Sequence, residues 1–513
     1  MGKLLDLKRL MSVPKERNRR RRQRQIRARN GSIDSVAKRK GSLCQQVANS
    51  DGERRTRYSG PNLPEDIWCH IHSLMPFKDA ARAACVSRAF RRSWQHRPNL
   101  IFCIGTLGLD FINKIDRIIK NHSDIGIKSL QLEYDTFCNA RRSASISYHL
   151  NNWLQIAVTP WIEELILTLS LSSYNVDYNF PCSLLSDGRG SSLRHLYLGS
   201  CFFHPTVNLE LRNLTRLHLV TVHITGDEFG CLLLNSYALE RLELKYCYGI
   251  ICLKIPCLLQ RLSHLEVFEC RMLQAIENKA PNLCSFDLGA RQVRLLLGES
   301  LQMKTLSLDY PSAVYYARAE LPSNVPNLEI LTICSDHEMV DTPMLPSKFF
   351  YLKCLTIDLA WRLSPAYDYF SLISFLDASP SLETFCLEIS QDRMENELII
   401  GDMSHMRQML EHRHDNLQSV EIIGFCYTKS LIELTCHILD NTTSLKHLKL
   451  DTTRDVFSCS TGKHDKCFHM GKDMLTEAKK AVLAIETYIE PKVPSTVMLS
   501  VVKPCNRCHV AES

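Results

Sequence analysis

One hydrophobic pattern recurs along most of the chain: Leu-x-x-Leu-x-Leu, with aliphatic residues or Phe as substitutes, occurs thirteen times between residues 127 and 450. Alternate residues of a strand point to the same side, so the last two apolar positions of each copy enter a core while the residues between them face outward. One copy cannot bury its own leucines, but stacked neighbours form a continuous core. The pattern therefore predicts a solenoid over residues 127–455, with short strands lining a concave sheet.

The copies are unevenly spaced, with successive starts 20 to 35 residues apart. Two weaker copies begin at Ile127 and Ile162, and the clear copies begin at Leu193, Leu214, Leu239, Leu262, Leu283, Met303, Leu328, Leu352, Leu382, Leu417 and Leu445. The shorter intervals are typical of leucine-rich repeats, and the longer ones predict loops inserted on the outer side. Cys201, Cys247 and Cys270 each follow the last apolar position of a copy by three residues. Their position resembles the one at which leucine-rich repeats have an inward-facing Asn or Cys. We therefore expect these thiols to pack in the core and not to take part in catalysis or metal binding.

Eight outward-facing positions on four consecutive copies are candidate target-binding residues: His195, Tyr197, Arg216, His218, Arg241, Glu243, His264 and Glu266. Their mixture of imidazole, guanidinium and carboxylate groups predicts a polar target. Any solvent-exposed strand face is also polar, so an ordinary exposed surface is the alternative interpretation.

Residues 61–97 have a helical periodicity instead of a strand-like one. Four apolar residues, spaced four, four and three positions apart, fall on one helical face: Leu63, Ile67, Ile71 and Leu74. Pro76 ends this helix. A second short helix is predicted from Asp79 to Cys85, with Ala81, Ala84 and Cys85 facing inward. Ser87 can cap a third one. Three such helices have too little core to be stable alone, so this segment is expected to need a partner.

Three motifs in the same segment stand in register: Leu63-Pro64-Glu65-Asp66, Leu74-Met75-Pro76 and Val86-Ser87-Arg88. Together they resemble the F-box. Phe90 stands where that family usually has Trp, and it still supplies an aromatic core residue. Ala80 replaces a larger aliphatic residue, which predicts a weaker partner contact. An arbitrary small helical bundle is the alternative interpretation.

An F-box followed by leucine-rich repeats resembles plant F-box/leucine-rich-repeat proteins, and the endings Val493–Val497 and Cys505–His509 resemble the close of such chains. The resemblance implies an α/β fold, with a disordered basic N-terminus, a small three-helix F-box, a leucine-rich-repeat solenoid and a C-terminal cap. It also implies a non-catalytic adaptor that recognises substrates for a Skp–cullin–F-box ubiquitin ligase and binds a target protein for ubiquitination. The residues that it implies for binding the Skp-type adaptor are Leu63, Pro64, Ile67, Leu74, Pro76 and Val86.

The charge of the chain is concentrated at one end. Residues 1–57 contain 18 Lys and Arg residues against 5 Asp and Glu residues, whereas residues 58–513 contain 44 against 50. The first segment has almost no aromatic residues, so it is predicted to be disordered. Its two basic clusters predict a nuclear-import signal made of Arg19, Arg20, Arg21, Arg22, Lys38, Arg39 and Lys40. A solvated tail without a specific partner and a nucleic-acid contact are the alternatives, the latter disfavoured because no aromatic residues are present for base stacking.

These patterns divide the chain into a basic tail (1–57), an F-box (58–100), a linker helix (101–126), the solenoid (127–455) and a C-terminal cap (456–513). The end of a solenoid exposes apolar core and needs a lid. Apolar residues at helical spacing between Gly471 and Pro491 predict a helix in this cap, and residues 496–502 predict a strand.

No apolar run is long enough to span a bilayer, and residues 1–6 lack the apolar segment of a secretory signal. Asp6 stands where a myristoylation signal requires Ser or Thr. The 22 cysteines are then expected to stay reduced. We expect an intracellular protein of the nucleus, the cytoplasm or both, without membrane association.

Cys505-x-x-Cys508-His509 matches a haem-attachment motif, but such attachment usually requires export. The same residues could hold zinc together with Cys459, His464, Cys467 and His469, although the spacing is irregular. A plain structural cap is favoured, so we expect neither a metal nor a cofactor. Phosphate-binding loops, dinucleotide-binding glycines and nucleophile-elbow motifs are absent from the sequence, and no catalytic residue is expected.

Two other functions compete with the adaptor. One is a leucine-rich-repeat scaffold that works outside any ligase, as a nuclear protein associated with nucleic acid through the basic tail. The other is an enzyme with an unrecognised site, which the lack of clustered catalytic motifs disfavours.

Overall fold

The structure is a computed structural model. It describes residues 64–122, 126–135, 143–170, 178–205, 209, 211–291, 293–298, 301–338, 341–359, 367–389, 407, 413–453 and 472–504. The chain divides into two compact units, Met1–Asn62 and Leu63–Ser513, and all described residues belong to the second unit. The predicted nuclear-import clusters, Leu63 and the Cys and His residues considered for zinc lie outside the described residues. Within them, no helix combines the length and the apolar character needed to cross a bilayer.

The first described element is a bundle of three helices, α3 (Glu65–Leu74), α4 (Phe77–Val86) and α5 (Arg88–Gln95). Prolines start the first two helices, because Pro64 and Pro76 occupy their N-cap positions. Ser87 ends α4 and caps α5, since its hydroxyl accepts the amide proton of Phe90 at 3.5 Å. The predicted stop at Pro76 and the predicted cap at Ser87 are thus confirmed, whereas α4 is longer than the predicted helix from Asp79 to Cys85.

One detail of this bundle differs from the sequence prediction. Cys85 is exposed, although we predicted it to face inward. Ala80 is the fully buried residue of α4, and its carbonyl oxygen lies 3.0 Å from Nε2 of His72. The weaker partner contact that we expect from Ala80 stays a prediction.

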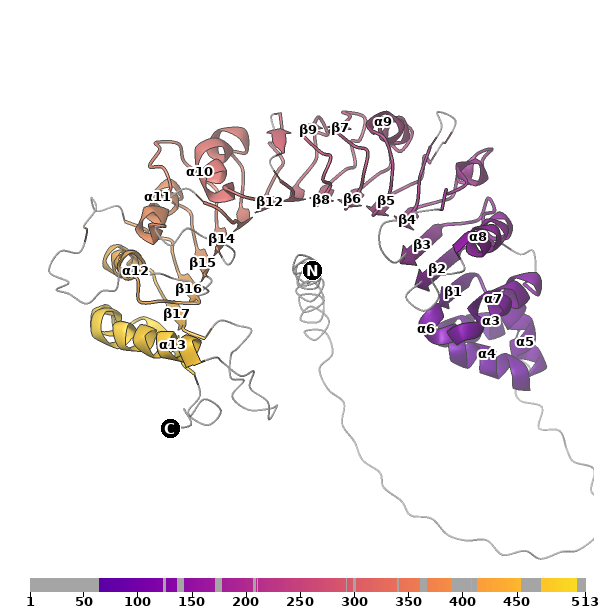
Figure 1. Cartoon of the computed structure of the whole chain (residues 1–513), viewed down its shortest axis with the longest axis horizontal. Helices are drawn as coiled ribbons and strands as arrows, with labels where there is room; N and C mark the ends of the chain where they lie inside the picture. The colour runs from indigo at the N-terminus through magenta and orange to yellow at the C-terminus, as the bar shows by residue number, and fades with distance from the viewer. Residues whose placement is uncertain are drawn as a thin grey trace, which may run out of the picture. The chain divides into compact units, whose positions relative to one another are not determined.

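The repeats form one parallel sheet of fifteen strands, which follow a curve in Figure 1. Each of the thirteen copies found in the sequence forms one strand. These strands are β2 (Ser129–Asp135), β3 (Glu164–Ser170), β4 (His195–Gly199), β5 (Arg216–Val220), β6 (Arg241–Lys245), β8 (His264–Phe268), β10 (Ser285–Gly289), β12 (Thr305–Asp309), β13 (Ile330–Cys334), β14 (Cys354–Leu359), β15 (Thr384–Ile389), β16 (Ser419–Ile423) and β17 (His447–Asp451). The predicted solenoid and α/β fold class are confirmed.

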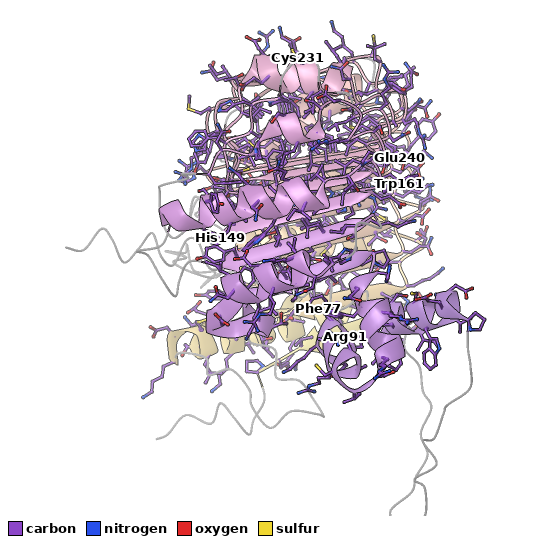
Figure 2. All side chains as sticks on the ribbon, turned by 90° about the vertical axis from the view of Figure 1, so that its right-hand side faces the viewer. Phe77, Arg91, His149, Trp161, Cys231 and Glu240 are labelled. Carbon is purple, nitrogen blue, oxygen red and sulfur yellow. The ribbon has the colours of Figure 1, made fainter. Side chains whose placement is uncertain are left out.

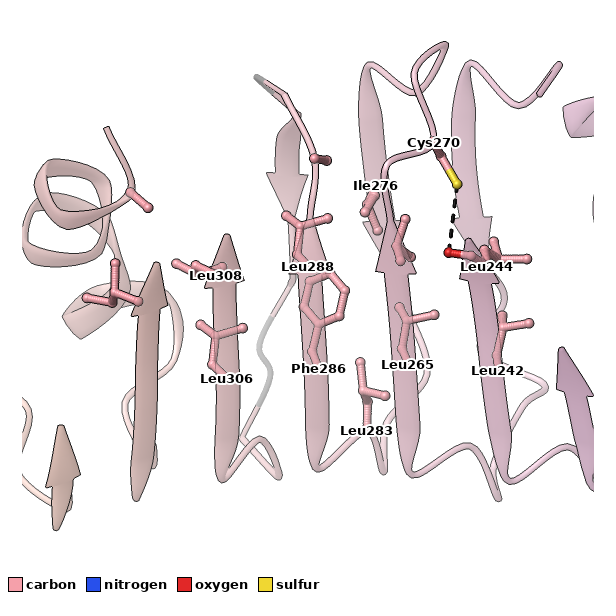
Figure 3. Close-up of a cluster of buried hydrophobic side chains, with 14 of the residues drawn as sticks. Leu242, Leu244, Leu265, Cys270, Ile276, Leu283, Phe286, Leu288, Leu306 and Leu308 are labelled. Carbon is pink, nitrogen blue, oxygen red and sulfur yellow. Dashed lines mark hydrogen bonds between the residues drawn. The ribbon is translucent and has the colours of Figure 1, made fainter. Parts of the chain in front are cut away.

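The core is a column of apolar side chains that runs under the whole sheet. Figure 3 shows the pairs Leu242/Leu244, Phe286/Leu288 and Leu306/Leu308 aligned from strand to strand. These six residues are at most 2% exposed. Full burial of one such side chain stabilises the fold by about 1.5–3 kcal/mol relative to exposure, which explains why the leucine spacing sets the strand register.

The recurring cysteines lie in this core, as predicted. Cys201, Cys247 and Cys270 are at most 4% exposed. The thiol of Cys247 donates to the carbonyl oxygen of Leu219 at 3.4 Å, and Cys270 makes the equivalent contact with Leu244 at 3.8 Å (Figure 3). Each thiol thus satisfies a carbonyl of the preceding repeat.

The outer side of the curve carries different elements in long and short repeats (Figure 1). The five outer helices α8 (Ser143–Ala157), α9 (Gly226–Leu234), α10 (Ala313–Asn324), α11 (Ile373–Ala378) and α12 (Lys429–Asn441) all lie in intervals of 25 residues or more. Three consecutive short repeats instead carry β7 (Cys252–Ile255), β9 (Ala275–Asn278) and β11 (Arg294–Leu296), which form a second parallel sheet. We predicted loops on the outer side of the longer intervals, and we did not predict the second sheet in the short ones. An interval of 20–23 residues leaves too few residues for a helix but enough for a second extended segment.

The sheet extends beyond the predicted solenoid at both ends. At its start, β1 (Asn99–Cys103) pairs with β2, within the stretch for which we predicted the end of the F-box and a helical linker. Helix α7 (Phe111–Lys120) follows and buries Phe111, Ile115 and Ile119. At its end, β18 (Met498–Val502) pairs with β17, and α13 (Lys472–Ala484) precedes it. The helix and the strand predicted for the cap are both present.

All strands of the sheet begin at the same edge, because they are parallel. Figure 2 shows Trp161 and Glu240 on this edge; they precede β3 and β6, respectively. Cys231, on α9, lies on the outer side in the same view. The other side of the sheet, opposite the outer helices, is the inner face of the solenoid. It carries the residues of each strand that point away from the apolar core.

Candidate functional site

The three-helix bundle exposes an apolar stripe. Ile67, Ile71 and Leu74 lie one turn apart on α3, with exposed fractions of 41%, 36% and 73%, and Val86 at the end of α4 is 86% exposed. The prolines that start both helices are exposed as well. Five of the six residues predicted to bind an adaptor are therefore at the surface, and the sixth, Leu63, lies outside the described residues.

The opposite face of α3 holds the bundle together through aromatic rings. Trp68 lies edge-on to Phe90 with ring centroids 5.1 Å apart, and the His72 ring lies 5.6 Å from that of Phe90 and 5.9 Å from that of Trp94. Phe90 thus fills the aromatic core position, as predicted. These rings face inward, so the apolar stripe lies on the outside of the bundle. In the isolated chain the stripe would be in contact with water.

A buried arginine that the sequence analysis missed closes the end of α3. Arg97 is 6% exposed, and its guanidinium donates to the carbonyl oxygens of His72 at 2.8 Å and Met75 at 3.0 Å. The last carbonyls of a helix have no partner within the helix, so a cation there satisfies them and complements the helix dipole. Burial lowers the pKa of the Arg97 guanidinium from its ordinary value.

The bundle is attached to the first repeat by direct packing. Phe77 lies edge-on to Phe102 of β1, with ring centroids 5.6 Å apart, and its place in the lower part of the molecule is shown in Figure 2. The imidazole of His122, just after α7, lies 2.8 Å from the carbonyl oxygen of Arg97. The apolar stripe is therefore carried at one end of the solenoid by buried contacts rather than by a flexible tether.

The eight predicted target-binding residues lie together on the inner face. The strand register places His195, Arg216, Arg241 and His264 in one row across β4, β5, β6 and β8, and it places Tyr197, His218, Glu243 and Glu266 in the next row. We call these eight residues the inner patch. The two rows lie two residues apart along each strand, or about 6.6 Å, so one bound peptide or surface loop can contact both rows.

Glu243 is the electrostatic centre of the inner patch. Its carboxylate lies 3.3 Å from Nδ1 of His218, 3.3 Å from Nζ of Lys245 and 3.7 Å from Nε of Arg241. Burial alone would raise the pKa of Glu243, but the hydrogen bonds and charges of His218 and Lys245 outweigh it and lower the pKa to about 2. Glu243 is therefore ionised at neutral pH.

At the other end of the inner patch, His264 is neutral instead of charged. Burial, and then the positive charge of Arg241, lower the pKa of His264 to about 4. His264 is therefore neutral at pH 7 and offers a hydrogen bond instead of a charge. Lys245, which we had not selected, bridges Glu243 and Glu266. It was predictable, since it stands two residues after Glu243 on the same face of β6.

An acidic recess lies beyond the patch, where β8, β10, β12 and β13 end. It has a volume of about 160 Å³, and its lining includes Glu269, Arg291, Asp309 and Asp336. Burial, together with the neighbouring carboxylates, raises the pKa of Asp309. Glu269, Arg291 and Asp336 follow strands rather than alternate along them, so the strand pattern gave no signal for them, whereas Asp309 is the last residue of β12.

Two family models match the chain. Residues 118–506 match the family model described as At1g61320/AtMIF1, LRR domain, and residues 61–102 match the F-box domain. The chain belongs to the plant F-box/leucine-rich-repeat family. The F-box match ends within β1, which agrees with the direct packing between the F-box and the first repeat.

Curated relatives from Arabidopsis thaliana are similar to the chain over different lengths. F-box/LRR-repeat protein At5g02910 is 30% identical over 209 residues, which cover 40% of this chain and 42% of the relative. FBD-associated F-box protein At1g66310 is 30% identical over 131 residues, or 23% of this chain and 29% of the relative. F-box/LRR-repeat protein 13 is 22% identical over 447 residues, or 78% and 93%. The chain thus spans less than half of the length of the first two relatives.

Membership in the F-box/leucine-rich-repeat family supports a role as a substrate receptor of ubiquitin ligases in general. Proteins of this family are typically non-catalytic adaptors. An F-box in general implies binding to a Skp-type adaptor.

Proposed function

We propose that this F-box/leucine-rich-repeat protein is the substrate-recognition adaptor of a Skp–cullin–F-box ubiquitin ligase, and that it binds a target protein through the inner patch. The observation that carries the proposal is the apolar stripe of Ile67, Ile71, Leu74 and Val86, which stays exposed on a bundle that packs firmly against the solenoid.

The stripe suits an apolar protein partner better than water. Burying apolar surface stabilises a complex by about 25 cal/mol for each Å², and large exposed aliphatic residues gathered on one face mark interaction sites. The Skp-type adaptor would cover this stripe and connect the chain to a cullin. The stripe itself consists of aliphatic side chains.

The catalytic contribution of such an adaptor is proximity. The solenoid holds a target at a fixed place relative to the F-box, so that lysines of the target meet the conjugating enzyme at a high effective concentration. The rigid junction at Phe77 and Phe102 matters for this mechanism, because a loose connection would lower that concentration.

The inner patch favours a target segment with both polar and charged groups. Arg216 and Arg241 lie in the first row and can pair with carboxylates, while Glu243 and Glu266 in the second row can pair with Lys or Arg side chains. Neutral His264 adds a hydrogen-bonding group. Charge complementarity of this kind favours specificity and fast association more than raw affinity.

The test is a binding measurement between the purified full chain and a purified plant Skp-type adaptor. We expect Leu74→Asp to weaken this binding at least tenfold, because it places a charge at the centre of the buried contact. Leu483→Asp is the matched control, since Leu483 is 63% exposed on α13 and belongs to no predicted contact. Equal affinities of the two variants and the unchanged chain would overturn the proposed adaptor role.

We further propose that the protein acts in the nucleus and the cytoplasm, with import through the basic clusters. A fluorescent fusion in which Arg19, Arg20, Arg21 and Arg22 are replaced by Ala should lose its nuclear fraction. The scaffold alternative makes a different prediction: salt-sensitive binding to nucleic acid that disappears when residues 1–57 are deleted.

A further inference from the structure

We propose that the inner face of β10, β12, β13, β14, β15 and β16 binds a basic segment of a protein partner, rich in Lys or Arg. We call this surface the acidic face. It is separate from the inner patch, which belongs to β4, β5, β6 and β8. The inference names the chemistry of a target segment, and it rests on the proposed function only in taking this segment as part of the target.

The acidic face is defined by the charges at the outward positions of its six strands. These positions carry neither Lys nor Arg, and five of them are acidic: Asp287, Asp309, Asp358, Glu388 and Glu421. Most of the others are Ser, Thr, Cys or Gly, which are short enough to leave room for the long side chains of a partner. An ordinary exposed face mixes both signs of charge, as the inner patch does with Arg216 and Arg241. The acidic face differs from it in having one sign alone.

The strand register gathers three of the carboxylates in one row. Asp309 of β12 stands beside Cys334 of β13, which stands beside Asp358 of β14. Glu388 of β15 comes next in the row. Neighbouring strands are about 4.8 Å apart, so the three carboxylates fall within about 14 Å. Like charges this close on a sheet repel each other, and a positive charge above them relieves the repulsion.

The two flanking strands, β8 and β17, supply too little positive charge to neutralise the acidic face. Lys449 on β17 lies 2.5 Å from Glu421, and His264 on β8 lies 3.8 Å from Asp287. His264 is neutral at pH 7, because burial and the charge of Arg241 lower its pKa to about 4. Among these described residues, one ammonium stands against five carboxylates, whatever pairs form within the fold. The difference of five and one leaves an excess of four negative charges.

The acidic recess lies at the edge of the acidic face, because Asp309 belongs to both. Its volume is about 160 Å³, and its lining adds the carboxylates of Glu269 and Asp336. Arg291, which is exposed, is the one basic residue of this lining. A cavity of about 150 Å³ is large enough for benzene, so the recess has room for the guanidinium or ammonium end of one side chain.

The negative surroundings are felt by ionisable groups along the acidic face. Burial, and then the neighbouring carboxylates, raise the pKa of Asp309. Burial, followed by the charges of Glu421 and Glu388, raises the pKa of Cys386 to about 12. Both shifts run in the direction that a bound positive charge would reverse. A concave surface with one sign of charge also attracts oppositely charged partners over a distance and speeds their association.

An extended basic segment fits this arrangement better than a single metal ion. Within the described residues, no three carboxylates of the acidic face bring ligand atoms within 4.8 Å of one another. The charges are instead spread across the strands. Asp309 and Asp358 stand two strands apart, or about 9.6 Å, while residues i and i+3 of an extended segment lie about 10 Å apart. A segment that crosses the strands with Lys or Arg at every third position would therefore place successive cations above this row.

The test measures binding of a synthetic peptide to the purified full chain. The peptide is labelled, carries Arg at every third position among Ser and Gly residues, and is compared with a peptide that has Glu in place of each Arg. We expect the Arg peptide alone to bind in a fluorescence anisotropy titration. Raising the salt concentration from about 0.1 M to about 1 M should weaken the binding, because the Debye length falls from about 10 Å to about 3 Å. Failure of the Arg peptide to bind the unchanged chain would overturn the proposal.

A pair of double variants separates the acidic face from general attraction by the chain. Glu269→Gln with Asp309→Asn should weaken binding of the Arg peptide at least tenfold, because it removes two carboxylates of the recess and preserves side-chain size. Glu163→Gln with Glu240→Gln changes the net charge equally and should leave the affinity within twofold. These two control side chains are each 43% exposed and lie just before β3 and β6. Equal weakening by both double variants would contradict a site on the acidic face.

A second variant answers if the recess variant does not fold. Thr332→Lys places an ammonium in the middle of the acidic face, at a half-buried position of β13, and should also weaken binding of the Arg peptide. Thr168→Lys is its control, since Thr168 is equally half-buried on the inner face of β3. Equal affinities of these two variants would count against the proposal.

Two further measurements distinguish this inference from its neighbours. Tighter binding after replacement of Arg19, Arg20, Arg21 and Arg22 by Ala would assign the acidic face to the chain's own basic segment, and would overturn the choice of a separate partner. Binding to the Skp-type adaptor is measured on the same preparations and should be equal in all of these variants. Lost peptide binding with intact adaptor binding removes this inference alone, whereas Leu74→Asp tests the adaptor role alone.

Discussion

The ammonium of Lys245 lies 2.8 Å from the carboxylate of Glu266, on the neighbouring strand of the inner face. It also lies 3.3 Å from Glu243, which the strand register places directly opposite Glu266. Two like charges opposite each other destabilise a sheet. Lys245 therefore makes the acidic half of the inner patch compatible with a stable fold.

Replacing Lys245 should lower the free energy of unfolding, because Glu243 and Glu266 then repel each other. Lys245→Met leaves Glu243 and Glu266 facing each other, and we expect a loss of about 1–3 kcal/mol at pH 7. Adding Glu266→Gln should recover part of the loss. Lys449→Met is the control, because its pair with Glu421 is more exposed and worth at most about 1 kcal/mol. Urea unfolding at pH 7 measures all three, and identical losses in both lysine variants would contradict this account.

His264 should make the fold less stable in mild acid. Its pKa is lowered to about 4 in the fold, against an ordinary value of 6.5, so between these values the unfolded chain binds the proton and the fold does not. Stability then rises with pH across this window and falls as the pH drops from 6.5 to 4, by on the order of 1–3 kcal/mol. The charged and titratable groups around this ring are Arg241, Glu243, Lys245, His218 and Asp287.

Unfolding free energies measured from pH 7 to pH 4 test this prediction. His264→Gln should have a flatter pH dependence than the unchanged chain, because Gln takes no proton in either state. The lowered pKa of Glu243, about 2, acts in a lower window: its stabilisation is complete above about 4.5 and is lost as the pH falls through 2. An unchanged slope above pH 4 in His264→Gln would show that this imidazole does not contribute.

Sequence spacing predicts some of these features and not others, for physical reasons. The leucine pairs predict the strands and the inner patch, because a strand alternates its sides regardless of what surrounds it. Lys245 could have been predicted in the same way. Arg97 could not, because the carbonyls that it satisfies lie 22 and 25 residues earlier and meet it only after the bundle packs.

Removing the Arg97 guanidinium should loosen the F-box and leave the solenoid intact. Arg97→Met leaves the carbonyl of Met75 without its guanidinium donor and leaves the carbonyl of His72 with the amide of Met75 alone, which should cost about 1–3 kcal/mol locally. We expect faster amide hydrogen exchange over 65–95 and weaker binding to a Skp-type adaptor, with unchanged exchange in β10–β15. Arg91→Met is the control, since Arg91 is exposed on α5 (Figure 2). Uniform exchange changes along the whole chain would contradict a local role.

Two glycines should respond to Ala in opposite directions. Gly424, after β16, has a φ of +78°, and a Cβ there would lie 2.1 Å from the carbonyl oxygen of Ile389. The left-handed backbone and the clash with main-chain atoms should together cost about 2–4 kcal/mol. Gly230, inside α9, has open space around the position of a Cβ, so Ala should stabilise the chain by about 0.5–1 kcal/mol through helix propensity. Melting temperatures should therefore fall for Gly424→Ala and rise slightly for Gly230→Ala. An unchanged or raised melting temperature for Gly424→Ala would show that the close approach of the β15 and β16 ends does not constrain the fold.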